Sequence, residues 1–169
     1  LACSMRIVSD SPKTTLGAPE VQLGLIPGAG GTQRLPRLVG IANALDLILS
    51  GRSLRPKQPF KMGLCDEVVA APILLEVARR RAQDATNKDR ARPRARKKPL
   101  AERARDLALE DNPAGRRILF SRALGELRKK TRGNYPAPEK ALEVIRIGIG
   151  QGLDAGYAAE ADRFGQLVV

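Results

Sequence analysis

The sequence predicts a mixed α/β fold with several C-terminal helices, and three observations support this expectation. Brief runs of β-branched residues alternate with longer segments whose apolar residues recur at helical spacing. Apolar residues make up 43% of the 169-residue chain, which is enough to form a substantial core. In addition, the stretch 16–40 sets one glutamate, five later glycines and two later prolines in an apolar frame, a composition typical of a tight turn between two elements.

Three short strands are expected, each bounded by turn residues: 6–8, 20–23 and 66–70. Apolar stripes predict helices within six further segments: 42–49, 53–63, 73–81, 107–127, 138–150 and 157–168. Gly51 and Gly63 are placed to end the first two helices, while Asn112-Pro113 interrupts the fourth. Pro59 lies inside the second helix, where we expect a distortion.

The chain is strongly basic, with 30 Lys and Arg against 18 Asp and Glu and a formal net charge of +12. Such an excess commonly indicates a nucleic acid or an anionic surface as partner. However, twelve basic and four acidic residues fall within 79–106, so much of the excess lies in one segment. Three Phe, two Tyr and no Trp leave few rings for stacking on bases, which disfavours nucleic acid. We expect 84–99 to be a flexible basic loop, because it has almost no apolar side chain to bury.

The chain contains no histidine, which excludes Ser-His and Cys-His catalysis and an imidazole base. Acid and base chemistry must therefore rest on carboxylates. Cys3 and Cys65 match no metal-binding or redox spacing, so we expect two reduced cysteines, no metal site and a cytoplasmic location. No apolar run of membrane-spanning length and no signal peptide is visible in these residues.

Glu20 is the candidate acid or base. It follows Pro19 in an apolar run, and burial of a carboxylate in such surroundings favours a role in proton transfer. The next segment, 27–31, predicts a turn with bare backbone N–H groups, and Thr32 is placed to cap a short helix that Pro36 limits. The pattern matches neither the dinucleotide-binding nor the phosphate-loop motif. By spacing alone, an ordinary turn and a solvated glutamate are the simpler interpretation.

Longer motifs change this balance. Pro19-Glu20, Leu23-Gly24 and Pro27-Gly-Ala-Gly-Gly-Thr-Gln-Arg-Leu resemble the second active-site segment of the crotonase (enoyl-CoA hydratase/isomerase) superfamily. Four flanking motifs resemble the hydratase half of the bacterial fatty-acid β-oxidation multienzyme α subunits, in their anaerobic form: Asp10-Ser-Pro-Lys-Thr-Thr-Leu-Gly, Leu54-Arg-Pro-Lys-Gln, Gly63-Leu-Cys-Asp-Glu-Val-Val and Thr131-Arg-Gly-Asn-Tyr-Pro-Ala. The resemblance implies an incomplete spiral of ββα turns followed by C-terminal helices.

The resemblance also implies a reaction and the residues that perform it. An enoyl-CoA hydratase, a carbon-oxygen lyase, adds water across 2-enoyl-CoA to give 3-hydroxyacyl-CoA, and relatives also convert Δ3 to Δ2 enoyl-CoA. Hydration needs a water for the β-carbon, a proton for the α-carbon and donors for the enolate oxygen. Glu20 matches the family's second glutamate, which gives the α-proton and helps hold the water. Gly28 matches the glycine whose N–H contacts that water, and Pro27 and Gly28 are the expected substrate-binding residues.

Other residues of the motif are expected to be structural. Gly30 and Gly31 shape the turn, and Pro19 fixes the approach to the glutamate. Arg34 is typical of the family, although an ion-pair donor near the helix start is the simpler interpretation. At the strand 66–70, Asp66 and Glu67 are expected to be solvated charges.

By the same resemblance, the chain divides into four parts: the second half of the hydratase core (1–78), a basic flexible loop (79–106), a helical part with a linker (107–135) and C-terminal helices that lead toward a dehydrogenase domain (136–169). The family's first glutamate and its thioester-binding N–H groups fall upstream of Leu1. We therefore expect this chain alone to be inactive on crotonyl-CoA. No dinucleotide-binding fingerprint occurs, so no cofactor is expected, and NAD only if a dehydrogenase domain follows.

The implied partners are an acyl-CoA thioester and, in a full complex, the thiolase β subunit, and a homo-oligomer is also open. Six apolar residues of the last two helices are expected to dock beyond the core and to cause self-association: Leu142, Ile145, Ile149, Phe164, Leu167 and Val168. Two alternatives stay open. The chain is a non-catalytic fragment that acts as an interaction module, or it is an RNA-binding relative, a hypothesis that rests on net charge alone.

Overall fold

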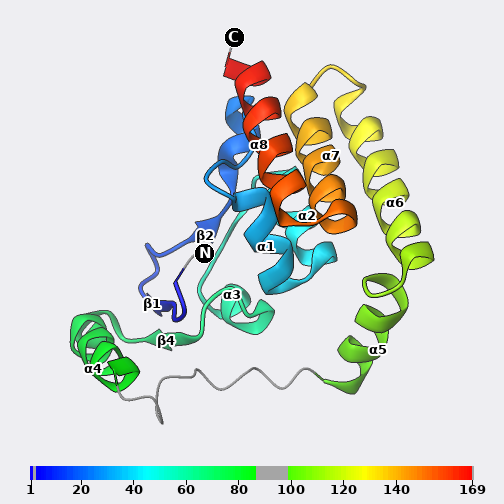
Figure 1. Ribbon diagram of the computed structural model, residues 1–169. Helices are drawn as coiled ribbons and strands as arrows, with labels where there is room; N and C mark the ends of the chain where they lie inside the picture. The colour runs from blue at the N-terminus through cyan, green and yellow to red at the C-terminus, as the bar shows by residue number, and fades with distance from the viewer. Residues whose placement is uncertain (2, 87–98, 169) are drawn as a thin grey trace. The chain divides into compact units, whose positions relative to one another are not determined.

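The computed structural model describes residues 1, 3–86 and 99–168 (Figure 1). Helices dominate, and two small sheets accompany them, so the predicted mixed α/β fold is confirmed. The short strands are β1 (Ile7–Ser9), β2 (Leu16–Gly17), β3 (Ser53–Leu54) and β4 (Glu67–Val69). One sheet pairs β1 with β4, and the other pairs β2 with β3.

The chain forms two compact units, and the first contains described residues of 1–16 and 54–97. Here β1 and β4 run parallel with Val8 opposite Val68, which confirms strands close to the two expected positions. The short helix α3 (Lys57–Met62) begins at Pro56 and ends at Gly63, whose φ of 82° only glycine adopts without strain. The helix starts later than the stripe from 53 predicted, because Ser53 belongs to β3. Pro59 is buried within it.

The helix α4 (Leu74–Thr86) follows the short 3-10 helix η2 (Ala71–Ile73) and extends beyond the predicted end at 81. Val77 is buried, and Arg81 donates to Glu67 of β4 at 3.0 Å, which ties the basic end of the helix to the sheet. Parts of the segment 79–106, which we expected to be a basic flexible loop, are therefore helical. Its first part lies in α4, its last part lies in α5, and 87–98 fall outside the described residues.

The second unit, which contains the described residues of 17–53 and 98–169, holds six α-helices among those residues. They are α1 (Gly31–Val39), α2 (Ile41–Ser50), α5 (Leu100–Leu109), α6 (Pro113–Thr131), α7 (Pro136–Gln151) and α8 (Leu153–Val168). As predicted, α2 ends at Gly51, with a φ of 64°, and Asn112 separates α5 from α6. The Asn112 side chain accepts from the backbone N–H groups of Ala114 and Gly115, which caps α6.

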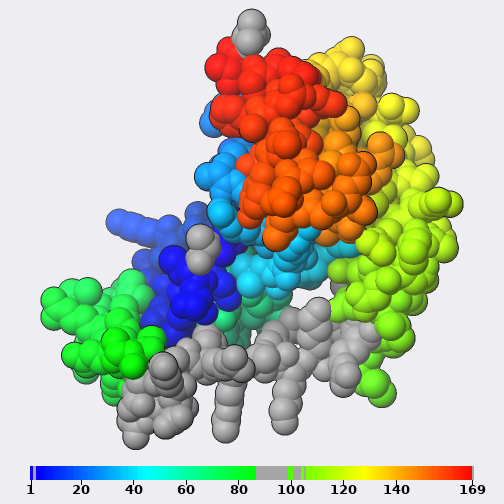
Figure 2. Space-filling model, in the orientation of Figure 1, coloured from blue at the N-terminus to red at the C-terminus, as the bar shows by residue number. Residues whose placement is uncertain are grey.

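The core of this unit lies where α7 packs against α1 and α2. Ile48 and Ile145 are fully buried there, and each contributes roughly 1.5–3 kcal/mol by leaving water. In Figure 1, α7 and α8 lie side by side as an antiparallel pair, and Figure 2 shows their side chains packed together on this face. Gly156 allows this close approach, because a Cβ there would lie 2.8 Å from the Gly148 Cα. A Cβ on either glycine would also overlap the buried side chain of Gln33.

Most of the apolar residues expected to form a docking surface on the last two helices are instead buried or partly buried within this chain. Leu142 and Ile145 are buried against the unit's own core, while Phe164 and Leu167 are partly buried. Val168, at 63% exposure, is the large apolar residue of the set that stays open to solvent. Apolar spacing identifies a buried helix face without identifying what buries it. Self-association of the chain stays a prediction.

Candidate functional site

The segment around Glu20 is a 3-10 helix, η1 (Pro19–Leu23), where a strand was predicted. Pro19 occupies its first position, where a missing N–H costs nothing, and Gly24 ends it with a φ of 80°. The backbone then turns back, so that the Leu25 N–H donates to the Glu20 carbonyl at 3.1 Å. The strand prediction was wrong because proline and glycine five residues apart favour one tight helical turn over an extended chain.

Glu20 is half-buried within this turn, because the adjacent Val21 is only 2% exposed and holds η1 against α2. The Oε2 atom of Glu20 is buried and has no hydrogen-bond partner among the residues that the structure describes. Buried polar atoms normally have a partner, so an orphaned carboxylate oxygen marks unused capacity to accept a hydrogen bond or a proton. This is the local chemistry that the sequence analysis assigned to an acid or base.

The glycine-rich turn that follows is tightly shaped. Ala29 and Gly30 both have positive φ, at 51° and 78°, and the Gly31 N–H closes the turn on the Gly28 carbonyl at 2.9 Å. A Cβ on Gly31 would lie 2.8 Å from the Pro27 ring, so this position requires glycine. Within the part of the chain that the structure describes, the Gly28 N–H has no protein acceptor. That donor is free for a bound water or substrate.

A carboxylate that the sequence analysis missed holds the other side of this turn. Glu160 of α8 is 5% exposed, and its Oε1 accepts from the Gly30 N–H at 2.6 Å. Its Oε2 accepts from the Thr32 N–H at 3.0 Å and from the Thr32 hydroxyl at 2.5 Å. Gly30 is the N-cap of α1 and has no side chain, so Glu160 caps this helix from 130 residues away. Thr32 therefore does not cap α1 as predicted.

Two other residues of α8 lie against the same turn. The Phe164 ring is 3.6 Å from the place that a Cβ on Gly28 would occupy. Arg34 donates to the Ala29 carbonyl at 2.5 Å and lies 5.7 Å from the centre of the Tyr157 ring. Arg34 thus braces the turn through a carbonyl and an aromatic ring instead of the expected ion pair.

The sequence contained a weak signal for this contact. Residues 157, 160 and 164 recur at helical spacing and share one face of α8. The stripe that we predicted instead used Ala158 and Ala161, and both are exposed. Sequence analysis did not single out Glu160, because only the fold supplies the donors that make its burial favourable.

Asp66 and Glu67 lie in the first unit and are engaged there. Asp66 accepts from the Arg6 backbone N–H at 2.7 Å and pairs with its guanidinium at 2.9 Å. Glu67 pairs with Arg81 at 3.0 Å. These ion pairs give both carboxylates a structural role. Nearby Cys65 is 2% exposed, and burial raises the pKa of its thiol.

No group of three or more acidic or thiol side chains in the described ranges could hold a metal ion. Over the same ranges, no helix is both long enough and apolar enough to cross a membrane.

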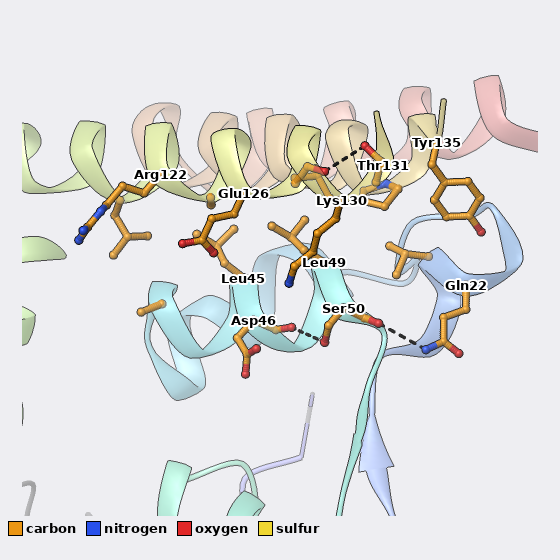
Figure 3. Close-up of a pocket in the computed structure, with 16 residues that line it drawn as sticks. Gln22, Leu45, Asp46, Leu49, Ser50, Arg122, Glu126, Lys130, Thr131 and Tyr135 are labelled. Carbon is orange, nitrogen blue, oxygen red and sulfur yellow. Dashed lines mark hydrogen bonds between the residues drawn. The ribbon is translucent and has the colours of Figure 1, made fainter. Parts of the chain in front are cut away.

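A groove of about 580 Å³ lies between α2 and α6, next to η1 (Figure 3). Leu45 and Leu49 line its apolar floor, and Lys130 reaches across it from α6 toward α2. Gln22 closes one end by donating to the Ser50 and Gly51 carbonyls at 3.3 and 3.0 Å. Neither Glu20 nor the glycine-rich turn lines this groove. The candidate acid and this groove are thus separate features.

This chain is similar to several known proteins. The pattern of the family described as Enoyl-CoA hydratase/isomerase matches residues 1–140. The fatty acid oxidation complex subunit alpha of Shewanella loihica is 53% identical over 169 residues, which are 100% of this chain and 23% of that protein. The subunit of the same name from Shewanella amazonensis is 52% identical over 168 residues, again 23% of its length. An enoyl-CoA hydratase structure from Bacillus anthracis is 28% identical, covers 99% of this chain and 46% of its own, and gives a TM-score of 0.46.

The matched residues contain the whole of η1 and the glycine-rich turn, with Glu20 and Gly28. The helix α8, with Glu160, lies beyond them. The chain spans about a quarter of the length of these two relatives.

Proposed function

Because the chain belongs to the enoyl-CoA hydratase/isomerase family, we propose that it supplies the acid/base part of an enoyl-CoA hydratase within a fatty acid oxidation subunit. The observation that carries this proposal is the buried, unpartnered Oε2 of Glu20 at the position of the family's second glutamate. A carboxylate kept without a donor in a folded chain costs stability, and such sites are commonly retained for chemistry. The substrate is a 2-enoyl-CoA thioester and the product is a 3-hydroxyacyl-CoA.

In this proposal, the water oxygen bonds to the β-carbon and its released proton passes to the family's first glutamate, while the C=C π bond breaks and the α-carbon takes up a proton. Glu20 gives that proton and accepts a hydrogen bond from the water with its unpartnered oxygen. The free N–H of Gly28 donates to the same water, and the absence of a side chain there leaves room for the acyl group. Pro27, which is buried, keeps the turn in place beside them.

A Δ3–Δ2 isomerase activity is proposed for the same carboxylate, since that reaction also moves a proton at the α-carbon. Neither reaction needs a cofactor, and NAD enters only if a dehydrogenase domain follows in a longer chain. The relatives are named as subunits of a complex, which supports a proposed partnership with a thiolase β subunit in the cytoplasm.

The test uses a chimera in which this chain replaces the matching 169 residues of the Shewanella loihica subunit. We expect the chimera to hydrate crotonyl-CoA, and Glu20→Gln to lower kcat by about 10²–10⁴-fold, as for other positioned acids. Glu126→Gln is the matched control, because Glu126 is an exposed carboxylate on α6. An unchanged rate in Glu20→Gln would make Glu20 structural and remove the proposal.

The alternative is that the chain is a non-catalytic interaction module. The groove between α2 and α6 favours it, because the groove is apolar at its floor and lies apart from Glu20. This alternative predicts that the chimera has no hydratase activity although it folds and assembles. Activity that depends on Glu20 would exclude it.

A further inference from the structure

The glycine-rich turn depends on a side chain from outside the family-matched residues. The α1 helix begins at Gly30, whose φ of 78° suits glycine but leaves the first-turn N–H groups without a side-chain cap of their own. The matching acceptors come from Glu160, which the chain reaches only after α7 and the first two turns of α8.

The geometry of Glu160 differs from that of an ordinary surface glutamate. Both carboxylate oxygens are used, and its three donors all belong to Gly30 and Thr32. No ion pair to Glu160 occurs among the described residues, so backbone dipoles and one hydroxyl stabilise its buried charge. The network continues inward, because Gln33, which is fully buried, donates from Nε2 to the Thr32 hydroxyl at 2.9 Å.

The contact of Glu160 with Gly30 and Thr32, called the clamp below, begins two residues after Gly28, whose N–H the proposed reaction uses. The Gly31 N–H bonds to the Gly28 carbonyl, so the peptide groups of Gly28 and Gly30 belong to one closed turn. Phe164, one helical turn beyond Glu160 on α8, lies close to the same turn at Gly28. A shift of the turn would therefore move the Gly28 N–H directly.

We propose that Glu160 is a positioning residue for hydration, and that α8 is part of the reaction machinery through the turn it holds. The proposal rests on the proposed function above. Glu160 does not touch the substrate in this scheme. It fixes the direction of the Gly28 N–H, and a displacement of about 1 Å at such a donor commonly costs one or two orders of magnitude in rate.

A matched control exists in the same unit. Gly40, the N-cap of α2, also lacks a side-chain cap, and Glu110 supplies the acceptors to the N–H groups of Ile41 and Ala42 at 2.7 and 3.1 Å. Glu110 thus performs the same capping at a helix that carries none of the proposed reaction groups. Its loss removes a long-range cap without disturbing the glycine-rich turn.

The experiment compares Glu160→Gln and Glu110→Gln in the chimera, because an amide leaves one acceptor where the carboxylate has two. We expect Glu160→Gln to lower kcat for crotonyl-CoA by roughly tenfold or more, while KM changes by less than about threefold. Glu110→Gln should stay within about twofold of the wild-type kcat. Equal losses in the two variants, or an unchanged kcat in Glu160→Gln, would overturn the proposal.

Amide hydrogen exchange provides a readout that does not need activity. Glu160→Gln should speed exchange in peptides that cover 28–34 by roughly tenfold, and Glu110→Gln should not. If the wild-type chimera is inactive, the proposed function fails, while unchanged exchange would separately overturn the clamp. Faster exchange together with an unchanged kcat would make Glu160 purely structural and overturn its role in the reaction.

Thr32→Val keeps the proposal testable should Glu160→Gln not fold. Valine has the shape of threonine and removes the hydroxyl, which donates to Glu160 and accepts from Gln33. We expect a smaller loss of kcat, about threefold, because two of the three donors remain. A kcat equal to wild type in this variant would count against the proposal.

Discussion

The half-buried Glu20 and the buried Glu160 have opposite surroundings. Glu160 satisfies both oxygens with donors from one turn, while Glu20 leaves its buried Oε2 without any. A glutamate side chain therefore caps a helix at position 160 and is an unsatisfied hydrogen-bond acceptor at position 20. The contrast shows that hydrogen-bond accounting distinguishes a positioning carboxylate from a candidate acid better than residue type or burial does.

The sharpest way to break this contrast is to replace each glutamate by leucine and to measure urea unfolding of the chain. Glu160→Leu leaves the N–H groups of Gly30 and Thr32 and the Thr32 hydroxyl unpaired, so we expect a loss of about 3 kcal/mol. Glu20→Leu removes an unsatisfied oxygen and should be neutral or slightly stabilising. Similar losses in both variants would contradict the distinction.

The close contact of α7 and α8 predicts the next effect. Gly156→Ala places a methyl group on the Gln33 side chain, which is fully buried and already bonded to Thr32. We expect about 1–3 kcal/mol of destabilisation from overpacking. Gly165→Ala on the same helix is the control, because its added Cβ meets no atom within 4 Å. Thermal unfolding of the two variants would show whether the clamp needs this packing.

Gly28→Ala tests the role of the Gly28 N–H with a smaller expected effect on stability. A Cβ there would meet the Phe164 ring at 3.6 Å, an ordinary van der Waals distance, so Gly28→Ala should change stability by less than about 1 kcal/mol. In the chimera it should nevertheless lower hydratase activity, because the methyl group enters the space proposed for the acyl group. Full activity would show that this N–H does not face the reaction.

The smallest expected effect concerns the solvent side of α7 and α8. The hydrogen bond from Arg163, at 2.9 Å, lowers the pKa of the Glu143 carboxyl. Because the folded pKa lies below the unfolded one, the stabilisation is present above the unfolded value and is lost as pH falls through the folded value. The gain is small, since both side chains are partly exposed. Glu143→Gln should flatten the acid side of the stability curve between about pH 3 and 5, measured by urea unfolding.

Local patterns in the sequence predicted a large part of this molecule. The helix boundary at Gly51, the break at Asn112 and the presence of strands around Val8 and Val68 follow from rules that act within a few residues, whereas the pairing of the strands does not. The motif from Pro19 to Leu35 also identified the family and its candidate acid before any fold was known.

Tertiary structure alone decided how the site is supported. The pairing of Glu160 with Gly30 and Thr32 joins residues about 130 positions apart, and no local preference indicates that a glutamate in a helix will be buried. The same holds for Glu110 at the start of α2, and for the unpartnered Oε2 of Glu20. Charged side chains enter a core only where the fold brings donors to them, and those donors are known only once distant segments are in contact.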